Sequence, residues 1–405
     1  MEHRKINKTL EIIASKNYSN ETELIESILN EIINYSDLNI HTAAFWQYEN
    51  NKYSFVSSNG KLKDFNFPDI SIEQYDLFRG DSKDRITILD KPFNIKNSDD
   101  YFTLLGVGDR TIINGKKYHE KLILFISNQI NDDIQFVLNI IATIIGSKLQ
   151  QQKIDANKQY LINEIEKAQE IQKSILPDHD FKFAGYEMFG VTLPAELIGG
   201  DFFDYLPTGD EHERLGIVVG DVASHGLSAA AEAMYISGAI RMASTFQINI
   251  SSFLKKINQL VNKIFADDKF CSLFYGELSN NKNGLFLYAS AGHNPPMFIS
   301  AKTGEIKYLK PTGPVLGPAK NALYETEHIN FDIGDVLLIY SDGITEANDE
   351  NYNFFGDKRV EELLKRNIHL TPKEICYNIL TEVMKFSAKH RFNDDKTLVA
   401  IKRYQ

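Results

Sequence analysis

The acidic residues most able to do chemistry stand beside glycine, at the ends of apolar runs that are predicted to be strands. They are Asp201, Asp221, Asp342 and the pair Asp394-Asp395. The sheet fixes the direction of a carboxylate next to a strand, and glycine lets backbone and ligand approach closely. Carboxylates that converge from several strands form a cage of hard oxygen ligands, which suits Mg²⁺ or Mn²⁺ better than Zn²⁺.

Each of these Asp–Gly steps has a simpler interpretation when it is taken alone, because aspartate and glycine are ordinary turn residues. Four such positions at the ends of apolar strands in one chain favour a metal site over four separate turns. Like charges that are held close repel strongly, and a fold keeps such a cluster only where cations neutralise it. The set as a whole therefore predicts a metal site.

The elements that must position these aspartates lie in the second half of the chain. Many short strands, with helices in blocks between them, predict a layered sandwich rather than a doubly wound sheet. The predicted strands cover residues 187–193, 203–206, 215–219, 272–278, 285–290, 297–300, 336–340 and 397–401. The predicted helices cover residues 227–245, 251–266, 358–365 and 372–387.

The first part of the chain, residues 1–149, is predicted to be a separate α+β domain of the size of a sensor domain. Apolar residues recur every four positions within a predicted helix over residues 6–35. A mixed sheet of five or six strands follows, with a polar turn at residues 49–51 and a hairpin signal at Asn114-Gly115. The predicted strands cover residues 40–60 in two parts, 86–89, 101–106 and 121–127, and a helix over 132–149 closes the domain.

Residues 150–177 are predicted to be a helical linker that ends at Pro177. Leu161, Ile165, Ala168, Gln172 and Ile175 are spaced as a heptad seam with one polar position. Two interpretations stay open: a helix packed on its own domain, or a two-stranded coiled coil that makes a homodimer and connects the two domains. Residues 178–405 would form the second domain.

Composition limits the classes of partner. The 405 residues include 44 Lys+Arg and 55 Asp+Glu, and the resulting net charge of −11 argues against a general binder of nucleic acid or of anionic membranes. Two cysteines do not make a disulfide framework, and they favour a reducing cytoplasm. The most apolar run, residues 136–149, is too short to span a membrane, and no signal peptide is evident at the N-terminus.

Six segments together resemble the metal-dependent PPM protein serine/threonine phosphatases, in particular the bacterial SpoIIE/RsbU-type branch. The resemblance covers about 225 residues, in order and at sensible spacing. Residues 168–177 (AQEIQKSILP) also resemble the helix that enters the phosphatase domain in this family. The six segments are ELIGGDFFDYL (196–206), GDVASHGLSAAAEAM (220–234), FCSLFYGEL (270–278), YASAGHNPPMF (288–298), LLIYSDGITEA (337–347) and NDDKTLVAI (393–401).

The resemblance implies an αββα sandwich with two Mn²⁺ or Mg²⁺ ions at one end. Carried over by motif, Asp201 and Asp221 would contact the metals, with Asp221 bridging both, and Asp342 and Asp394 would bind on the other side. The backbone carbonyl of Val222 would complete one coordination sphere.

Four further residues belong to these motifs with lesser roles. Asp204 would support the site from behind the ligands, while Gly200 and Gly343 flank the metal aspartates and Asp395 is the alternative to Asp394. The mechanism that the resemblance implies is direct hydrolysis by a metal-activated water.

Some residues depart from the family pattern or allow other roles. Ser224 stands at a usual glycine position, where a positive φ would be strained. His225 is expected to pack at the start of the following helix rather than act as an acid, and His293 to shape a loop rather than bind metal. Cys271 is expected to be a buried, inert thiol.

The N-terminal domain resembles a GAF-type sensor domain in its architecture. The whole chain is thus interpreted as a bacterial cytoplasmic signalling phosphatase whose sensor controls it through the helix. The resemblance implies phosphoserine or phosphothreonine on a STAS-type antagonist of an anti-sigma factor as the substrate, in partner-switching regulation of a sigma factor. The alternatives are a catalytically silent scaffold with a phosphatase fold, or another two-metal phosphohydrolase.

Overall fold

The computed structural model describes residues 18, 20–34, 38–80, 85–95, 99–113, 115–130, 132–209, 213–246, 248–265, 269–280, 283–388 and 394–405. The chain divides into two compact units, Met1–Leu161 and Ile162–Gln405. Each is described by itself.

The first unit is built on one six-stranded sheet with the strand order β3-β2-β1-β6-β5-β4. Every neighbouring pair of strands in it is antiparallel, so the expectation of a mixed sheet is wrong. Tight hairpins join β1 to β2 and β5 to β6, and a tight hairpin reverses the direction of the chain. Its strands are β1 (Ile40–Glu49), β2 (Lys52–Gly60), β3 (Ile70–Ser71), β4 (Ile86–Leu89), β5 (Tyr101–Ile113) and β6 (Lys116–Ser127).

The turn residues identified in the sequence form two hairpins of this sheet. Asn50 and Asn51 join β1 to β2 with φ values of 49° and 66°, and Gly115 joins β5 to β6 with φ 78°. Asparagine and glycine tolerate this left-handed backbone better than other residues. Asn114 and the first part of the expected helix over residues 6–35 lie outside the described residues.

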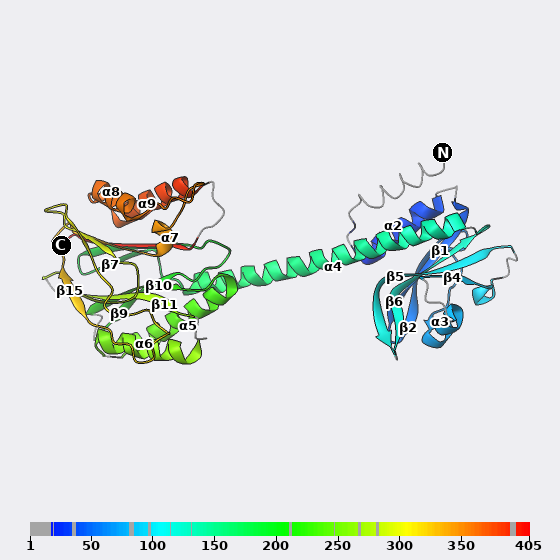
Figure 1. Cartoon of the computed structure of the whole chain (residues 1–405), viewed down its shortest axis with the longest axis horizontal. Helices are drawn as coiled ribbons and strands as arrows, with labels where there is room; N and C mark the ends of the chain where they lie inside the picture. The colour runs from blue at the N-terminus through cyan, green and yellow to red at the C-terminus, as the bar shows by residue number, and fades with distance from the viewer. Residues whose placement is uncertain are drawn as a thin grey trace. The chain divides into compact units, whose positions relative to one another are not determined.

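Helices cover both faces of this sheet (Figure 1). On one face, α2 (Glu21–Asn34) and the first half of α4 (Asp132–Ile175) pack on residues such as Phe45 and Phe125. On the other face, α3 (Ile72–Arg79) and the short helix η2 (Pro92–Asn94) lie over a core rich in aromatic side chains, including Trp46 and Phe102. This architecture is α+β, as expected, while its assignment as a GAF-like sensor stays a prediction.

The second unit is an αββα sandwich, as expected. Its two sheets have the strand orders β15-β12-β11-β10-β9 and β14-β13-β16-β17-β8-β7. The first sheet contains β9 (Phe202–Thr208), β10 (Arg214–Val222), β11 (Cys271–Ser279), β12 (Leu285–Ala291) and β15 (Glu327–Asn330). The second contains β7 (Asp180–Phe183), β8 (Tyr186–Leu193), β13 (Met297–Ile299), β14 (Ile306–Tyr308), β16 (Val336–Tyr340) and β17 (Lys396–Arg403).

Three apolar cores hold the four layers together. Inner-face residues such as Phe203 and Val399 fill the space between the two sheets. Helices α5 (Gly226–Ser244) and α6 (Ile250–Ile264) cover the outer face of the first sheet. Helices α8 (Asp357–Asn367) and α9 (Pro372–Ser387) cover the outer face of the second, and Figure 1 shows the two helix pairs on opposite sides of the sandwich.

Helix α4 runs without a break from Asp132 to Ile175. The closing helix expected over residues 132–149 and most of the expected linker over 150–177 are therefore parts of one element. Gly146 lies within this helix without breaking it, no proline occurs in it, and Pro177 follows its end. No helix in the described ranges combines the length and the apolar character needed to cross a membrane.

Candidate metal centre

Asp201 and Asp221 lie at the same edge of the first sheet. Strands β9 and β10 are antiparallel, and Gly220 of β10 pairs with Phe202 of β9. Asp221 follows Gly220 and Asp201 precedes Phe202, so both aspartates lie at this edge. Asp201 is 3% exposed. The β10 strand ends here because the chain leaves the sheet toward α5.

Asp342 and Asp394 lie at the matching edge of the second sheet. Tyr340 of β16 pairs with Leu398 of β17, and the Ser341 amide donates to the carbonyl of Thr397 at 3.1 Å. The next residue, Asp342, opens the short helix α7 (Asp342–Thr345), close to the start of β17. The two sheets of the sandwich thus bring together four predicted carboxylates that are up to 193 residues apart in sequence.

The electrostatics of Asp201 show that these edges face one another. Burial, and then the charges of Asp221 and Asp395, raise the pKa of Asp201 well above its ordinary value of 3.8. Side-chain hydrogen bonds from Ser341, which directly follows β16, and from Thr397 of β17 offset only part of this effect. Among the described residues, the buried Oδ2 atom of Asp201 has no hydrogen-bond partner.

Two other aspartates respond to the same crowding. Burial, and then the charges of Asp342 and Asp394, raise the pKa of Asp221 to about 7. Burial, and then the charge of Asp394, raise the pKa of Asp342 to about 6. The four carboxylates are therefore close enough to repel one another at neutral pH.

The donor set fits a hard divalent cation. It supplies carboxylate oxygens, one of them buried without a partner, and it carries a repulsion that a cation would relieve. Within the described residues, no three His, Cys, Asp or Glu side chains are gathered tightly enough to hold one metal ion by themselves. This does not conflict with Mg²⁺, which commonly takes one or two carboxylates and completes its shell with water.

This crowding predicts how stability depends on pH when no metal is bound. The folded-state pKa of Asp221 lies above the unfolded value, so between about pH 4 and 7 the folded state binds more protons than the unfolded state. The free energy of unfolding should therefore fall by a few kcal/mol as the pH rises through this window. Urea titrations at pH 5 and pH 8 in chelator test this, and Mn²⁺ or Mg²⁺ should restore stability at pH 8 but much less at pH 5. A metal-free protein that gains stability over this pH range would contradict the arrangement.

Asp395 has a different role from its neighbour Asp394. Its buried carboxylate accepts hydrogen bonds from the backbone amides of Ala195 at 2.7 Å, Gly200 at 2.6 Å and Asp201 at 3.2 Å. It thereby fixes the loop that presents Asp201. Asp394 is exposed, and its Oδ1 accepts from the Asp395 amide at 2.8 Å, so Asp394 stays the predicted ligand of the pair.

The motif glycines are required by close approach around Asp395. A Cβ atom on Gly199 would stand 2.3 Å from Asp395 Oδ2, and one on Gly343 would stand 2.0 Å from the Asp395 carbonyl oxygen. At Gly200 it would lie 3.1 Å from the carbonyl oxygen of Val222. That carbonyl accepts from the Ser224 amide at 2.6 Å and retains a second lone pair, so its predicted role as a metal ligand stays open.

The second motif is less strained than its sequence suggests. Ser224 is not among the residues with positive φ, so the strain expected there is wrong, and Gly226 adopts the left-handed conformation instead, at φ 66°. The Ser224 hydroxyl donates to Glu232 at 2.9 Å. His225 stands at the N-cap position of α5 and makes no side-chain capping bond.

His293 and Cys271 lie behind the site. Ser272 pairs in register with Asp221, and its hydroxyl is 2.8 Å from Nδ1 of His293, which is 1% exposed. Burial lowers the pKa of His293 to about 4, so the ring is neutral at physiological pH. Burial also raises the pKa of the Cys271 thiol, which agrees with an inert packing role.

Asp204 supports the site through a residue that the sequence analysis did not identify. Arg241 of α5 donates from Nε to Asp204 at 2.5 Å and from Nη2 at 3.2 Å, and Nη2 also donates to the carbonyl of Ile175 at 2.6 Å. This arginine therefore joins β9, α5 and the last turn of α4. Sequence alone offers little signal for it, because its partners lie 37 and 66 residues away.

The last turns of α4 also contact the loop before Asp201. Gln172 Nε2 donates to the carbonyl of Gly199 at 2.7 Å, and the Gly199 amide donates back to Gln172 Oε1 at 3.4 Å. One turn earlier, Gln169 donates to the carbonyl of Leu197 at 2.6 Å. Gln172, the polar position of the predicted heptad seam, thus contacts its own unit. For this end of α4, that favours a helix packed on its own domain over a coiled coil.

The second unit is similar to a known family of domains, and most of the chain is similar to named phosphatases. Residues 211–404 match the family model described as stage II sporulation protein E (SpoIIE). RsbU of Bacillus subtilis (strain 168), named a phosphoserine phosphatase, is 26% identical over 289 residues, which are 70% of this chain and 84% of RsbU. RsbP of the same organism, also named a phosphoserine phosphatase, is 24% identical over 242 residues, which are 59% of this chain and 57% of RsbP.

A solved structure agrees with the fold. The SiaA-PP2C domain of Pseudomonas aeruginosa superposes with a TM-score of 0.52 and 19% identity, over 62% of this chain and 99% of that domain. At this identity the likeness concerns the fold alone.

Proposed function

We propose that this chain is a PPM-type protein serine/threonine phosphatase that removes phosphate from phosphoserine or phosphothreonine on a signalling protein. The match of residues 211–404 to the SpoIIE family model and the two relatives named phosphoserine phosphatases support this proposal. The observation that carries this proposal is the meeting of Asp201, Asp221, Asp342 and Asp394 from both sheets at one edge of the sandwich.

The proposed site holds two Mn²⁺ or Mg²⁺ ions, which the phosphatases of this family require. When bound, such ions supply a hydroxide-like water at neutral pH and stabilise charge on the phosphoryl oxygens. Asp201, Asp221, Asp342 and Asp394 would hold these ions. Asp395 orients the loop that carries Asp201, and the neutral His293 with Ser272 supports the strand that carries Asp221.

The proposed substrate is a phosphoserine or phosphothreonine on a STAS-type antagonist in a partner-switching pathway, by analogy with relatives named phosphoserine phosphatases. Phosphate release from matched phosphoserine, phosphothreonine and phosphotyrosine peptides tests the class. We expect turnover of the first two to exceed that of phosphotyrosine by at least about tenfold. Preference for phosphotyrosine, or hydrolysis of nucleotides in preference to every peptide, would reject the class, and a folded protein that hydrolyses none of them would support the scaffold alternative.

We also propose that α4 carries regulation from the first unit to the metal centre. The support is local to the second unit: Gln172 and Gln169 hold the loop before Asp201, and Arg241 holds the carbonyl of Ile175. A change in the position of this end of α4 would change the position of Asp201. A homodimer through α4 stays part of the proposal, since Ile154, Leu161 and Ile171 are exposed on it, and sedimentation of Leu161→Glu against the wild type would test it.

Replacing Gln172 by alanine should weaken metal binding without unfolding the protein. The substitution removes both hydrogen bonds to Gly199, and changes just behind metal ligands cost about 10- to 100-fold in metal affinity or activity. We expect the Mn²⁺ concentration for half-maximal turnover to rise about tenfold. Gln151→Ala is the matched control, because the Gln151 side chain donates to Asp155 one turn along the same helix, away from the loop before Asp201, and its loss should change nothing. An equal Mn²⁺ requirement in both variants would reject the coupling.

A further inference from the structure

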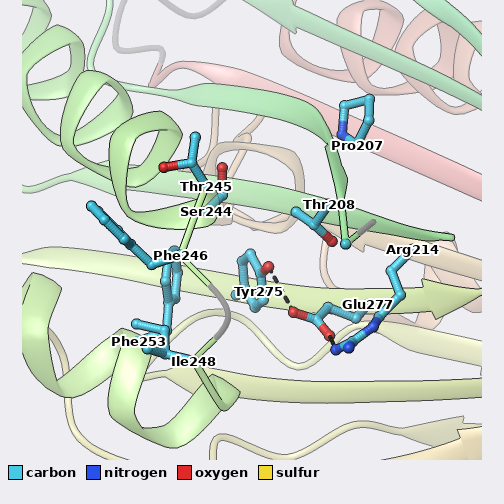
Figure 2. A pocket seen from close by; sticks show the side chains of 11 residues that line it. Pro207, Thr208, Arg214, Ser244, Thr245, Phe246, Ile248, Phe253, Tyr275 and Glu277 are labelled. Atoms are coloured by element: carbon cyan, nitrogen blue, oxygen red, sulfur yellow. Dashed lines mark hydrogen bonds and ion pairs between the residues drawn. The ribbon is translucent and has the colours of Figure 1, made fainter. Parts of the chain in front are cut away.

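A concave site lies at the opposite end of β9 and β10 from the candidate metal centre. Thr208 pairs with Arg214 at that end of the strands, whereas Asp201 and Asp221 lie at the other. The cavity has a volume of about 260 Å³ and is bounded by the end of α5 and the start of α6 (Figure 2). This is slightly below the range of about 300–1,000 Å³ for pockets that hold drug-sized ligands, so it suits a small metabolite.

One wall of this cavity is apolar. Phe246, Ile248 and Phe253 form it, and Phe246 remains 60% exposed although it is a large aromatic residue. Phe253 packs against Tyr275, with ring centroids 4.5 Å apart, so this wall is anchored in the core beneath α6. An aromatic or branched apolar group placed here would bury the exposed face of Phe246.

The opposite wall is polar and centres on a buried carboxylate. Glu277 is 8% exposed; its Oε1 accepts from the Tyr275 hydroxyl at 2.9 Å, and its Oε2 is 3.5 Å from Arg214 Nη1. Figure 2 shows these three side chains in a row along the cavity. A carboxylate offers about four acceptor positions, and a buried one is costly unless its partners are close. One short hydrogen bond and one long ion pair leave Glu277 with acceptor capacity on the cavity side.

Two hydroxyl groups around the cavity, those of Ser244 and Thr245, offer acceptors rather than donors. The Ser244 hydroxyl donates to the carbonyl of Arg241 at 2.8 Å, and the Thr245 hydroxyl donates to that of Met242 at 2.7 Å. Their hydrogens are therefore committed to α5, while their oxygens can still accept. Thr208 Oγ1 is buried and has no partner among the described residues. The complementary ligand must bring several donors, which is what a primary ammonium group has.

We propose that this cavity binds a small primary amine with an aromatic or branched apolar body. The ammonium group would face Glu277 and the hydroxyl oxygens, and the apolar body would face Phe246, Ile248 and Phe253. An anion is disfavoured, because the cation in the lining, Arg214, is already directed at Glu277.

Occupancy of this cavity would hold the C-terminal end of α5. Ser244, Thr245 and Phe246 form its wall on that side, and Arg241, one turn earlier, bonds both Asp204 and the last carbonyl of α4. A bound amine should therefore slow amide hydrogen exchange at residues 241–246. This readout does not depend on phosphatase activity, so it tests the cavity separately from the proposed function.

The test compares phenethylamine with 2-phenylethanol, which has nearly the same shape and no charge, by calorimetric titration of the full-length protein. We expect phenethylamine to bind at least about tenfold more tightly, because a hydrogen bond to a charged group is worth more than a neutral one. Glu277→Gln keeps an acceptor for Tyr275 and should abolish this preference. Phe246→Ala should weaken both ligands, while the exposed and remote Glu305→Gln should change neither.

Equal affinity for the two probes would overturn the proposal, as would an unchanged preference in a folded Glu277→Gln protein. Absence of saturable phenethylamine binding, or binding without slower exchange at residues 241–246, would also overturn it.

Discussion

Replacement of Asp221 by asparagine is expected to abolish metal-dependent phosphatase turnover while leaving the metal-free protein at least as stable as the wild type. Asparagine removes one of the four proposed metal-binding carboxylates, and loss of a metal ligand should cost at least about a hundredfold in turnover. It also removes one charge from a crowded group, whose repulsion raises the pKa of Asp221 to about 7. Without metal at pH 8, the free energy of unfolding should therefore rise by about 1–3 kcal/mol.

The two halves of this prediction separate function from folding. An inactive variant that unfolds more easily would be ordinary damage to the fold, whereas an inactive variant that is more stable in chelator identifies a site selected for binding cations. Asp332→Asn is the matched control, because Asp332 is an exposed aspartate of the same unit that pairs with Lys302 at 2.8 Å. It should leave turnover unchanged. Full activity of Asp221→Asn would remove the basis of the proposed centre.

Replacement of Gly343 by alanine should be the most damaging single-methyl change near the site. The added Cβ would stand 2.0 Å from the Asp395 carbonyl oxygen and 3.0 Å from its carbonyl carbon, and neither backbone atom can rotate away as a side chain can. Overpacking of this kind costs about 1–3 kcal/mol and sometimes more. The strain should separate α7 from the start of β17, and so move Asp342 away from Asp394. We expect at least about 2 kcal/mol of lost stability together with a large loss of turnover.

Gly238→Ala provides the same chemical change without the clash. Gly238 is exposed within α5, and nothing lies within 4 Å of where its Cβ would be. Alanine in an exposed helix interior should raise the free energy of unfolding by about 0.5–1 kcal/mol. Denaturant titrations of the two variants side by side measure both effects. A Gly343→Ala protein as stable as Gly238→Ala would show that the approach of α7 to β17 is looser than described.

Much of the second unit is predictable from sequence because its strands are short apolar runs bounded by turn residues. The expected strand over residues 336–340 coincides with β16, and the expected helix over 372–387 coincides with α9. A Thr-Pro pair begins α9, and Thr371 caps it in a capping box with Glu374. The acidic positions are visible for the same reason, since each follows or precedes a strong strand signal.

Three strands that the sequence analysis missed have weak local signals. Strands β7, β14 and β15 have three or four residues each and lie at sheet edges, where pairing with one neighbour decides their conformation. The distinct roles of Asp394 and Asp395 are equally hidden. Only the fold shows that amides almost 200 residues away point at one of them.

Tertiary packing also decided the features of the first unit and of α4. Local apolar runs locate the strands between residues 40 and 127, but they do not show that every neighbouring pair is antiparallel. The heptad spacing of α4 does not show that Gln172 faces the loop before Asp201 instead of a second helix. Periodicity reports which face of a helix is apolar, and the partner of that face depends on the rest of the chain.

Phosphate release from a phosphoserine peptide by the full-length protein, in Mn²⁺, in Mg²⁺ and in chelator, tests the central claim most directly when Asp342→Asn is measured beside the wild type. The proposed centre predicts turnover with at least one of the two metals, none in chelator, and a loss of at least about a hundredfold in Asp342→Asn at saturating metal. Phosphate release that persists in chelator, or that Asp342→Asn leaves unchanged, would contradict a metal centre built from these four aspartates.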